Sequence, residues 1–371
     1  MYIDEQTEHI EACRYCFLCR HACSVFEVTQ RDTNSARGLA IVLSAVQRGI
    51  LDWKEDVVEV LYQCTAGRRC RGWCEPGWDI AEAVLAARAD IVEQGLAPCA
   101  AVAVRDKVEA NDSPYGEPDE NKVAFAPPDR VGRDGEVLYF AGCVTGFEEP
   151  EIARATSEVL ERAGVDYGVL QDEPCCGAPF WQLGFRDEAR AQAQTVAGRI
   201  AASGCATVVF SCPTCYRTIV KDYPQLGVQL DHGIRPLHIT EYITELYDEK
   251  RLDLSSLADV TVTYQDPCHL GRGMEVYEPP RRVLTDILGA NLTEMSWNRD
   301  KAHCCGSGSC MQATNPSLVA QVAGVTLDMA RDTKAAILAT ACPMCKMTFS
   351  NQAEGMEVRD VTELVAQAIS R

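Results

Sequence analysis

The sequence lacks a long hydrophobic segment. Although 47% of its 371 residues are hydrophobic, no apolar run approaches the roughly 20 residues that a helix needs to cross a bilayer. The first residues, MYIDEQTEHIEAC, are acidic and do not show the basic and then apolar regions of a secretory signal. We therefore expect a cytoplasmic protein, peripheral to a membrane only through a partner.

Basic residues are also scarce. Lys and Arg number 35 against 54 Asp and Glu, which gives a net charge of -19 at pH 7. A chain this acidic is repelled by nucleic acid and by anionic membranes, so we predict no nucleic-acid partner.

Motifs for an organic redox cofactor or for hydrolytic catalysis are missing as well. No GxGxxG turn follows a predicted strand, and no flavin or nicotinamide motif stands out, so we predict no intrinsic flavin. The sequence shows no Ser/His/Asp set, paired acids or phosphate loop. Two-electron chemistry therefore has to come from a partner.

Cysteine, in contrast, is abundant, with 20 residues. In a reducing compartment, cysteines clustered at short spacings are metal ligands or redox groups more often than disulfides. Two stretches, QDEPCCGAPF and RDKAHCCGSGSC, each place two cysteines side by side before a glycine. A disulfide within such a pair is disfavoured, because neighbouring Cα atoms are about 3.8 Å apart and disulfides prefer about 4.4–6.8 Å.

The chain divides into an amino-terminal region, a connecting segment and two repeats. Residues 1–98 show helical spacing of apolar residues, with cysteine clusters between the predicted helices. Residues 99–135 are rich in Pro, Gly and charge and are predicted to form a linker or strap. Residues 136–250 and 258–371 repeat one another, because equivalent cysteines recur after 125 to 130 residues.

Each repeat alternates short β-rich runs with amphipathic helices. In the first repeat we predict strands at 137–140, 165–170 and 206–211, with helices near 150–163 and 185–203. Strands that alternate with helices imply parallel βαβ units. The predicted fold is therefore mixed, with an all-α domain followed by two duplicated α/β domains.

Each repeat supplies five cysteines, all just after predicted strands, where open parallel sheets keep their sites. Tetrahedral zinc takes four ligands, and so does a cubane 4Fe-4S cluster. Five thiols are understandable if both members of the adjacent pair bind one enlarged cluster, which Gly177 or Gly306 lets the backbone approach. The candidate ligands are Cys143, Cys175, Cys176, Cys212 and Cys215 in the first repeat, and Cys268, Cys304, Cys305, Cys342 and Cys345 in the second.

Several nearby residues have alternative interpretations. Cys99 and Cys205 lie outside the repeated pattern and are predicted to be buried or free structural cysteines. Cys310 is either a spare thiol or a further member of the second site. His269 follows Cys268 directly; it either tunes a cluster or donates a proton, or only satisfies local hydrogen bonds.

Each repeat has the pattern of one cysteine, then CC, then CxxC. This pattern resembles the cysteine-rich CCG domain of heterodisulfide reductases. The same domain is found in iron-sulfur subunits of anaerobic glycerol-3-phosphate dehydrogenase, glycolate oxidase and lactate-utilisation complexes. The gaps are 31 and 35 residues in the first copy and 35 and 36 in the second. DPCHLGR, from Asp266 to Arg272, is typical of the second copy. The resemblance covers nearly the whole chain and implies a noncubane 4Fe-4S cluster on the five cysteines of each copy, although related subunits carry other cluster types.

The amino-terminal region contains CRYCFLCRHAC, with the CxxCxxCxxxC spacing of two-cluster ferredoxins, in which the fourth cysteine ligates the other cluster. This similarity implies a ferredoxin-like two-cluster domain. The second block, CTAGRRCRGWCEP, has Gly67 where a cysteine is expected, so its cluster is a 3Fe-4S centre or a ligand-poor 4Fe-4S cluster, or it is absent. The predicted ligands are Cys13, Cys16, Cys19 and Cys74 for the first 4Fe-4S cluster, and Cys23, Cys64 and Cys70 for the second.

Four redox sites in series predict the iron-sulfur subunit of a multi-subunit oxidoreductase. It would relay electrons between a flavoprotein dehydrogenase or electron-transfer flavoprotein and a quinone, a membrane cytochrome or another acceptor. An alternative is a disulfide reductase whose two CCG clusters face a shared cleft, with Cys176, Cys305 and His269 as catalytic candidates. A zinc-binding structural protein is a third alternative.

Overall fold

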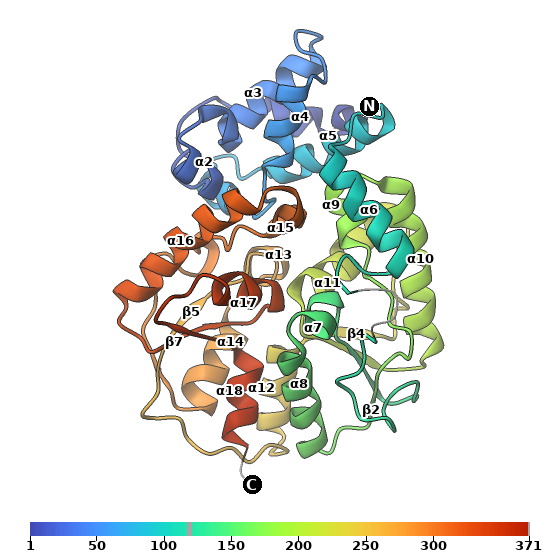
Figure 1. Ribbon diagram of the computed structural model, residues 1–371, viewed down its shortest axis with the longest axis vertical. Coiled ribbons are helices and arrows are strands. Elements are labelled where there is room, and N and C mark those ends of the chain that lie inside the picture. The colour runs from blue at the N-terminus through green and yellow to red at the C-terminus, as the bar shows by residue number, and fades with distance from the viewer. Residues whose placement is uncertain (117–120, 370–371) are drawn as a thin grey trace.

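The computed structural model describes residues 1–116 and 121–369 of the chain (Figure 1). Two four-stranded parallel sheets form its framework, with strand orders β2-β1-β3-β4 and β6-β5-β7-β8. The two orders match, which is the expected result of a duplicated unit. The strands are β1 Val137–Phe140, β2 Tyr167–Gly168, β3 Thr207–Phe210, β4 Arg235–His238, β5 Thr261–Gln265, β6 Asn291–Leu292, β7 Ile337–Thr340 and β8 Glu357–Asp360.

The central strands have apolar sequences because helices cover both faces of each sheet. All residues of β1, β3 and β7 are buried. The edge strands are more polar, and β4 and β8 were not among the predicted strands. β2 is shorter than the predicted run of 165–170, because at Val169 the chain pairs instead with Val131 of the connecting segment.

Helices of the first copy pack directly against helices of the second. Helix α8 of the first copy lies against α18 of the second, and α12 of the first lies against α14 of the second. Helices α8, α12 and α18 lie between the two sheets (Figure 1). The helical elements are α7 Cys143–Phe147, α8 Pro150–Arg162, α9 Ala178–Leu183, α10 Arg186–Ala202, α11 Pro213–Arg217, η4 Thr218–Asp222, η5 Tyr223–Leu226, α12 Ile239–Asp248, α13 Gly271–Met274, α14 Glu278–Arg282, η6 Val283–Ile287, η7 Arg299–Lys301, η8 Gly308–Cys310, α15 Met311–Thr314, α16 Pro316–Asp332, α17 Pro343–Ser350 and α18 Val361–Ala368.

The amino-terminal residues form helices that sit across one end of both copies (Figure 1). Arg88 fixes this module to the first copy, since its fully buried guanidinium donates to the carbonyls of Leu61, Cys64 and Gln182. The elements are η1 Tyr2–Gln6, α1 Thr7–Glu11, α2 Ser24–Thr29, η2 Asp32–Asn34, α3 Ala36–Gln47, α4 Glu55–Tyr62, η3 Arg69–Trp73, α5 Ile80–Glu93 and α6 Cys99–Asn111.

The predicted linker of residues 99–135 is helical in its first part, where α6 spans Cys99–Asn111. The run CAAVAVRDKVEA consists largely of residues that a helix accepts, and the Gly- and Pro-rich part begins only after it. Residues 117–120 of this segment, and 370–371 of the second α/β region, lie outside the described residues. The domain boundaries given above stay predictions.

No helix in the described ranges is both long enough and apolar enough to cross a membrane.

Candidate metal centres and the cavity between them

The first copy brings its five predicted cysteines into one row. Cys143 opens α7 after β1, the adjacent pair lies in the loop before α9, and the CxxC cysteines follow β3. Hydrogen-bonding contacts link neighbouring thiols along this row. In order, the row is Cys143, Cys175, Cys176, Cys215 and Cys212.

The second copy repeats the row with the equivalent residues. Cys305 and Cys345 bring their Sγ atoms to 3.4 Å, and the other neighbours also make thiol contacts. In order, the row is Cys268, Cys304, Cys305, Cys345 and Cys342. Each cysteine of both rows lies after the carboxyl end of a strand, either in the loop or at the start of the next helix. This is the position that the βαβ pattern predicts.

Both glycines of the CCG motifs have backbone conformations that other residues rarely adopt. The φ angle is +74° at Gly177 and +93° at Gly306. At Gly306 a Cβ atom would also come within 3.0 Å of the Val319 carbonyl oxygen. Glycine after the cysteine pair is therefore required by its positive φ angle in both copies, and by the lack of space for a Cβ atom at Gly306.

The electrostatic environment lowers the pKa of Cys176 and Cys212 in the first row and of Cys304 in the second. Hydrogen bonds from Cys175 and Cys215 lower the pKa of Cys176 to about 6. In the second copy, hydrogen bonds from Cys268 and Cys305 lower the pKa of Cys304 well below its usual range. Thiolates are the form that binds metal, so a lowered pKa in each row favours metal binding.

A cation lies near each row, buried in the first copy and partly buried in the second. Lys122 lies across Gly146 of α7, where a Cβ would come within 2.5 Å of the lysine Cγ, and its Nζ donates to the Glu173 carbonyl at 2.5 Å. Burial alone would lower the pKa of Lys122, but Cys143, Glu173 and Cys175 raise it above its ordinary value. This lysine comes from the connecting segment.

Arg272 is the corresponding cation of the second copy. Its Nε donates to the Gly67 carbonyl at 2.6 Å and its Nη1 to the Ala302 carbonyl at 2.9 Å. Its Nη2 is buried and has no hydrogen-bond partner within the described residues. Sequence reasoning placed Arg272 in a motif without a role and gave no signal for Lys122, because lysines in polar segments are usually exposed.

The amino-terminal cysteines of the two predicted clusters lie next to one another, and their assignment to clusters stays a prediction. The first group lines a small cavity of about 70 Å³, and burial raises the pKa of its member Cys19 to about 11. In the second group burial raises the pKa of Cys23 to about 12, and its members influence one another electrostatically. The groups are Cys13, Cys16, Cys19 and Cys74, and Cys23, Cys64 and Cys70; Cys70 also borders the first cavity.

Gly67, the residue that interrupts the ferredoxin pattern, lies against the second copy. A Cβ atom at this position would be 3.3 Å from Thr65 Oγ1, 3.7 Å from Cys304 Sγ and 3.8 Å from Arg272 Nη2. Arg69 extends the contact by donating from Nε to the Lys301 carbonyl at 2.9 Å. The loop that follows Cys64 therefore lies between the second cysteine group and the cysteine row of the second copy.

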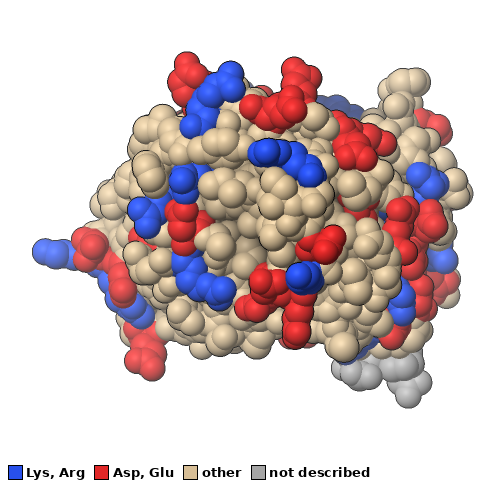
Figure 2. Space-filling view, turned by 90° about the horizontal axis from the view of Figure 1, so that it is seen from above, with Lys and Arg blue, Asp and Glu red and all other residues tan. Residues whose placement is uncertain are grey.

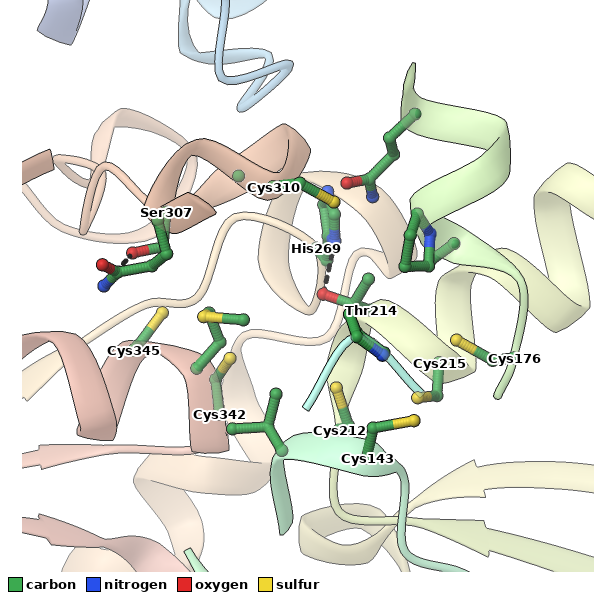
Figure 3. A pocket seen from close by; sticks show the side chains of 18 of the residues that line it. Cys143, Cys176, Cys212, Thr214, Cys215, His269, Ser307, Cys310, Cys342 and Cys345 are labelled. Carbon is green, nitrogen blue, oxygen red and sulfur yellow. Dashed lines mark hydrogen bonds between the residues drawn. The ribbon is translucent and has the colours of Figure 1, made fainter. Parts of the chain in front are cut away.

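The two rows face one cavity of about 260 Å³ (Figure 3). Figure 3 shows Cys342 and Cys345 on one side and Cys143, Cys176, Cys212 and Cys215 on the other. The prediction of a shared cleft is thereby confirmed. Cys304, at the back of its row, does not line the cavity, and the other nine cysteines of the rows do.

His269 and Cys310 also line this cavity, whereas Cys99 is exposed and Cys205 is buried elsewhere in the core. His269 Nδ1 bonds to Thr214 Oγ1 at 2.9 Å, so a residue of the second copy meets the CxxC loop of the first. Burial, together with nearby Arg217 and Arg68, lowers the pKa of His269 well below its usual value and keeps the ring neutral.

The donor sets fit iron-sulfur clusters better than single ions. Within the described ranges, no group of His, Cys, Asp or Glu side chains converges as the ligands of one metal ion do. Five sulfurs in a continuous row suit a cluster that takes several thiolates, whereas one tetrahedral zinc would leave a buried thiol without a role. The residues present therefore fit the clusters that the motifs imply.

Comparison with known proteins agrees with these motifs. A model described as the cysteine-rich domain, CCG, matches residues 137–220 and 262–350. The chain is 34% identical over 334 residues to one subunit of the dihydromethanophenazine:CoB--CoM heterodisulfide reductase of Methanosarcina acetivorans, and the match covers 87% of this chain and 80% of the relative. The chain belongs to this CCG iron-sulfur family. The predictions of the family and of an iron-sulfur oxidoreductase are confirmed.

Other members of the CCG family differ in their named reactions. The chain is 26% identical to one subunit of the fumarate reductase (CoM/CoB) of Methanothermobacter marburgensis, over 99% of this chain and 74% of the relative. A hypothetical protein of known structure from Helicobacter pylori covers 91% of this chain and 68% of its own, with a TM-score of 0.60 and 8% identity. That likeness shows a shared fold and nothing about the reaction.

Proposed function

We propose that this CCG protein is the iron-sulfur subunit of a multi-subunit oxidoreductase, in which electrons pass between a flavoprotein partner and an acceptor bound between the two copies. The observation that supports this function best is the single cavity lined by cysteines of both rows. A cluster held by each row would supply or accept single electrons there. The chain itself positions the acceptor and excludes water from it.

The arrangement of the cysteine groups suggests a route for the electrons. Cys16 is exposed, and the loop that carries it also exposes Tyr15, Phe17 and Leu18, with 61% of the Phe17 surface accessible. The guanidinium groups of Arg20 and Arg37 lie 5.8 and 4.7 Å from the Phe17 ring centre. We infer that a partner docks on this loop, because aromatic and arginine side chains are the usual anchors of protein interfaces.

The route then continues through the second cysteine group. Cys23, Cys64 and Cys70 would hold a 3Fe-4S or ligand-poor 4Fe-4S cluster, next to the 4Fe-4S cluster of the first group. From there the loop at Gly67 leads to Cys304, so the second copy receives electrons before the first.

Figure 2, seen from the amino-terminal end, shows basic and acidic side chains interspersed with uncharged surface, so no single charge dominates the view.

The partner is inferred to be a flavoprotein, either a dehydrogenase or an electron-transfer flavoprotein. The chain shows no flavin motif, and a flavin converts two-electron chemistry into the single electrons that iron-sulfur clusters carry. The named relatives are subunits of reductases, which supports an assembly of this kind. A quinone or a membrane cytochrome is the alternative acceptor.

Reduction of a disulfide is the second candidate function, because the two rows face one another. Cys176 and Cys305 come from the adjacent pairs of the two copies, and both line the cavity. A disulfide between the rows takes up two electrons and two protons, its S–S bond breaks, and two thiols leave. His269 lines the cavity and is held by Thr214 through Nδ1, so its Nε2 is positioned to form a hydrogen bond with a leaving sulfur, and the two protons come from solvent.

Anaerobic purification followed by iron and sulfide assays and low-temperature EPR tests the proposal. We expect a coloured protein whose clusters are reduced by dithionite and by the reduced flavoprotein that co-purifies with it. A colourless protein loaded with zinc would contradict both candidate functions. Clusters that a flavoprotein reduces, without any reaction of disulfides, would leave only the relay.

A further inference from the structure

The adjacent cysteines of the second copy lie in different surroundings. Cys305 packs with Cys342 and Cys345 in one apolar cluster. Cys304 is also buried, but it packs in another cluster, with Val25 of α2. It is the one row cysteine that does not line the cavity between the copies, and its counterpart in the first copy does line it. Cys304 therefore differs from its equivalent in the duplicated unit.

The amino-terminal module surrounds Cys304. Thr65, directly after Cys64, has its Oγ1 atom 4.0 Å from Cys304 Sγ. Cys23 packs against the apolar cluster that contains Cys304, where α2 lies on α16. Arg69 is close enough to both cysteines for their charges to act on its guanidinium. Cys304 therefore borders the second amino-terminal group, which consists of Cys23, Cys64 and Cys70.

Gly67 marks the place where this group lacks a thiol. In the spacing of two-cluster ferredoxins a cysteine at residue 67 would be a cluster ligand. The φ angle of Gly67 is outside the left-handed region, so the backbone would accept a side chain. The sulfur nearest to a Cβ atom built there is Cys304 Sγ, at 3.7 Å. A cysteine at residue 67 would place its sulfur close to the one that Cys304 already supplies.

A cation facing the same point provides an independent observation. Arg272 Nη2 would lie 3.8 Å from the Cβ atom built on Gly67. This nitrogen is buried and has no hydrogen-bond partner among the described residues. Buried donors normally have partners, and an unpaired buried charge is costly. The Arg272 guanidinium therefore requires an anionic acceptor at this point, and thiolate sulfur bound to iron is such an acceptor.

We propose that Cys304 is the fourth thiolate of the second amino-terminal cluster, in place of the ligand that Gly67 cannot provide. Cys304 also keeps its thiol contacts to Cys268 and Cys305, so its sulfur is shared between this cluster and the site of the second copy. Ligation forms one Fe–S bond without electron transfer. The inference rests on the proposed function, since it requires clusters on both sets of cysteines, and it specifies how they are joined.

Matched alanine variants test the proposal in the full-length protein purified without oxygen. Cys304→Ala removes the proposed shared sulfur, and Cys175→Ala makes the same change at the equivalent position of the first copy. Alanine is used because a serine oxygen can itself bind iron. Cys64→Ala identifies the EPR signal of the second amino-terminal cluster by its loss.

Cys304→Ala should change the EPR signals of the second copy and of the second amino-terminal cluster. Without its fourth thiolate, the amino-terminal cluster should lose about one iron atom and show a 3Fe-4S signal in the oxidised protein. Cys175→Ala should change the signal of the first copy alone. An unchanged signal from the first amino-terminal cluster shows in each variant that the chain is folded.

A rescue experiment separates loss of a ligand from disturbed packing. Gly67→Cys in the Cys304→Ala background offers a thiolate from the amino-terminal side of the same space. We expect the double variant to lose the 3Fe-4S signal and to regain the iron atom, while the signal of the second copy stays altered. Gly72→Cys is the matched control, because a Cβ atom there faces Asp300, and it should not rescue.

The outcomes separate the inference from the proposed function. If Cys304→Ala changes only the signal of the second copy, or if Gly67→Cys fails to restore the iron, the inference is wrong and the relay stands. A 3Fe-4S signal that depends on Cys64 and is already present in the natural protein would overturn it as well. Absence of iron and sulfide would instead refute the proposed function itself.

Discussion

The two copies of the α/β unit share strand order and cysteine rows but differ in what surrounds them. The cation of the first row, Lys122, comes from the connecting segment. The cation of the second row, Arg272, lies four residues after Cys268, the first cysteine of that row. Phe147 occupies the equivalent position in the first copy. Only the second row touches the Gly67 loop through Cys304. Duplication thus preserved the ligands, while the connections to the rest of the chain made the sites unequal.

The largest expected effect comes from removing one member of an adjacent pair in either copy. Cys176→Ser and Cys305→Ser should each remove the cluster of their own copy and leave the amino-terminal clusters intact, since a row of five thiolates would lose an internal member. Iron analysis and EPR measure this. Unchanged iron in both variants would show that the second cysteine of the pair is not a ligand.

A smaller effect should distinguish the two cations. Arg272→Lys keeps a positive charge but loses the fork that holds the Gly67 and Ala302 carbonyls, so we expect slower reduction of the second copy by the amino-terminal clusters, by about tenfold. Lys122→Met should leave this rate unchanged and lower the midpoint potential of the first copy only. Rapid-freeze EPR and redox titration follow the two effects. Equal slowing in both variants would contradict the proposed route through the second copy.

The copies should also differ in the pH dependence of their stability. His238 and Asp360 occupy equivalent positions, each buried and capping the last helix of its copy. Burial lowers the pKa of His238 to about 3 and raises that of Asp360 to about 7. His238 therefore makes the protein less stable as pH falls below about 6.5, because the unfolded chain then binds more protons than the folded one. Asp360 makes the protein less stable as pH rises from about 4 to 7, because the folded chain then holds a proton that the unfolded chain has lost.

Matched asparagine variants, which retain a capping side chain, test this difference. His238→Asn should remove part of the acid sensitivity and Asp360→Asn part of the sensitivity near neutral pH, each by roughly 2–4 kcal/mol at most. Anaerobic Tm measurements from pH 5 to 8.5 provide the comparison. Parallel curves for the two variants would contradict the opposite burial effects.

The smallest effect is expected at Gly67. Gly67→Ala places a methyl group 3.3 Å from Thr65 Oγ1, a contact that a slight side-chain movement relieves, so stability should change by less than about 1 kcal/mol. Gly67→Cys should change the EPR spectrum of the second amino-terminal cluster by offering a fourth thiolate. Unchanged spectra and iron content would show that no labile iron corner exists there.

Much of the architecture could be predicted because it follows from local sequence patterns. The recurrence of Cys143 as Cys268 and of the adjacent pairs revealed the duplication, and the strand-helix alternation predicted parallel sheets. The edge strands β4 and β8 escaped prediction because they are short and polar. Helix α6 was missed because the Pro- and Gly-rich residues that follow it dominate the composition of its segment.

The sequence by itself determined which thiols can act together, because cysteine spacing and the position of strand ends are local properties of the chain. Only the tertiary structure decided which other residues line the predicted cleft, that Thr214 of the first copy contacts His269 of the second, and that Lys122 reaches the first row. Lys122 comes from the connecting segment outside both repeats, and the packing of α8 on α18 and of α12 on α14 sets the relation between the copies. Contacts of this kind depend on how separate elements pack, and no local pattern encodes them.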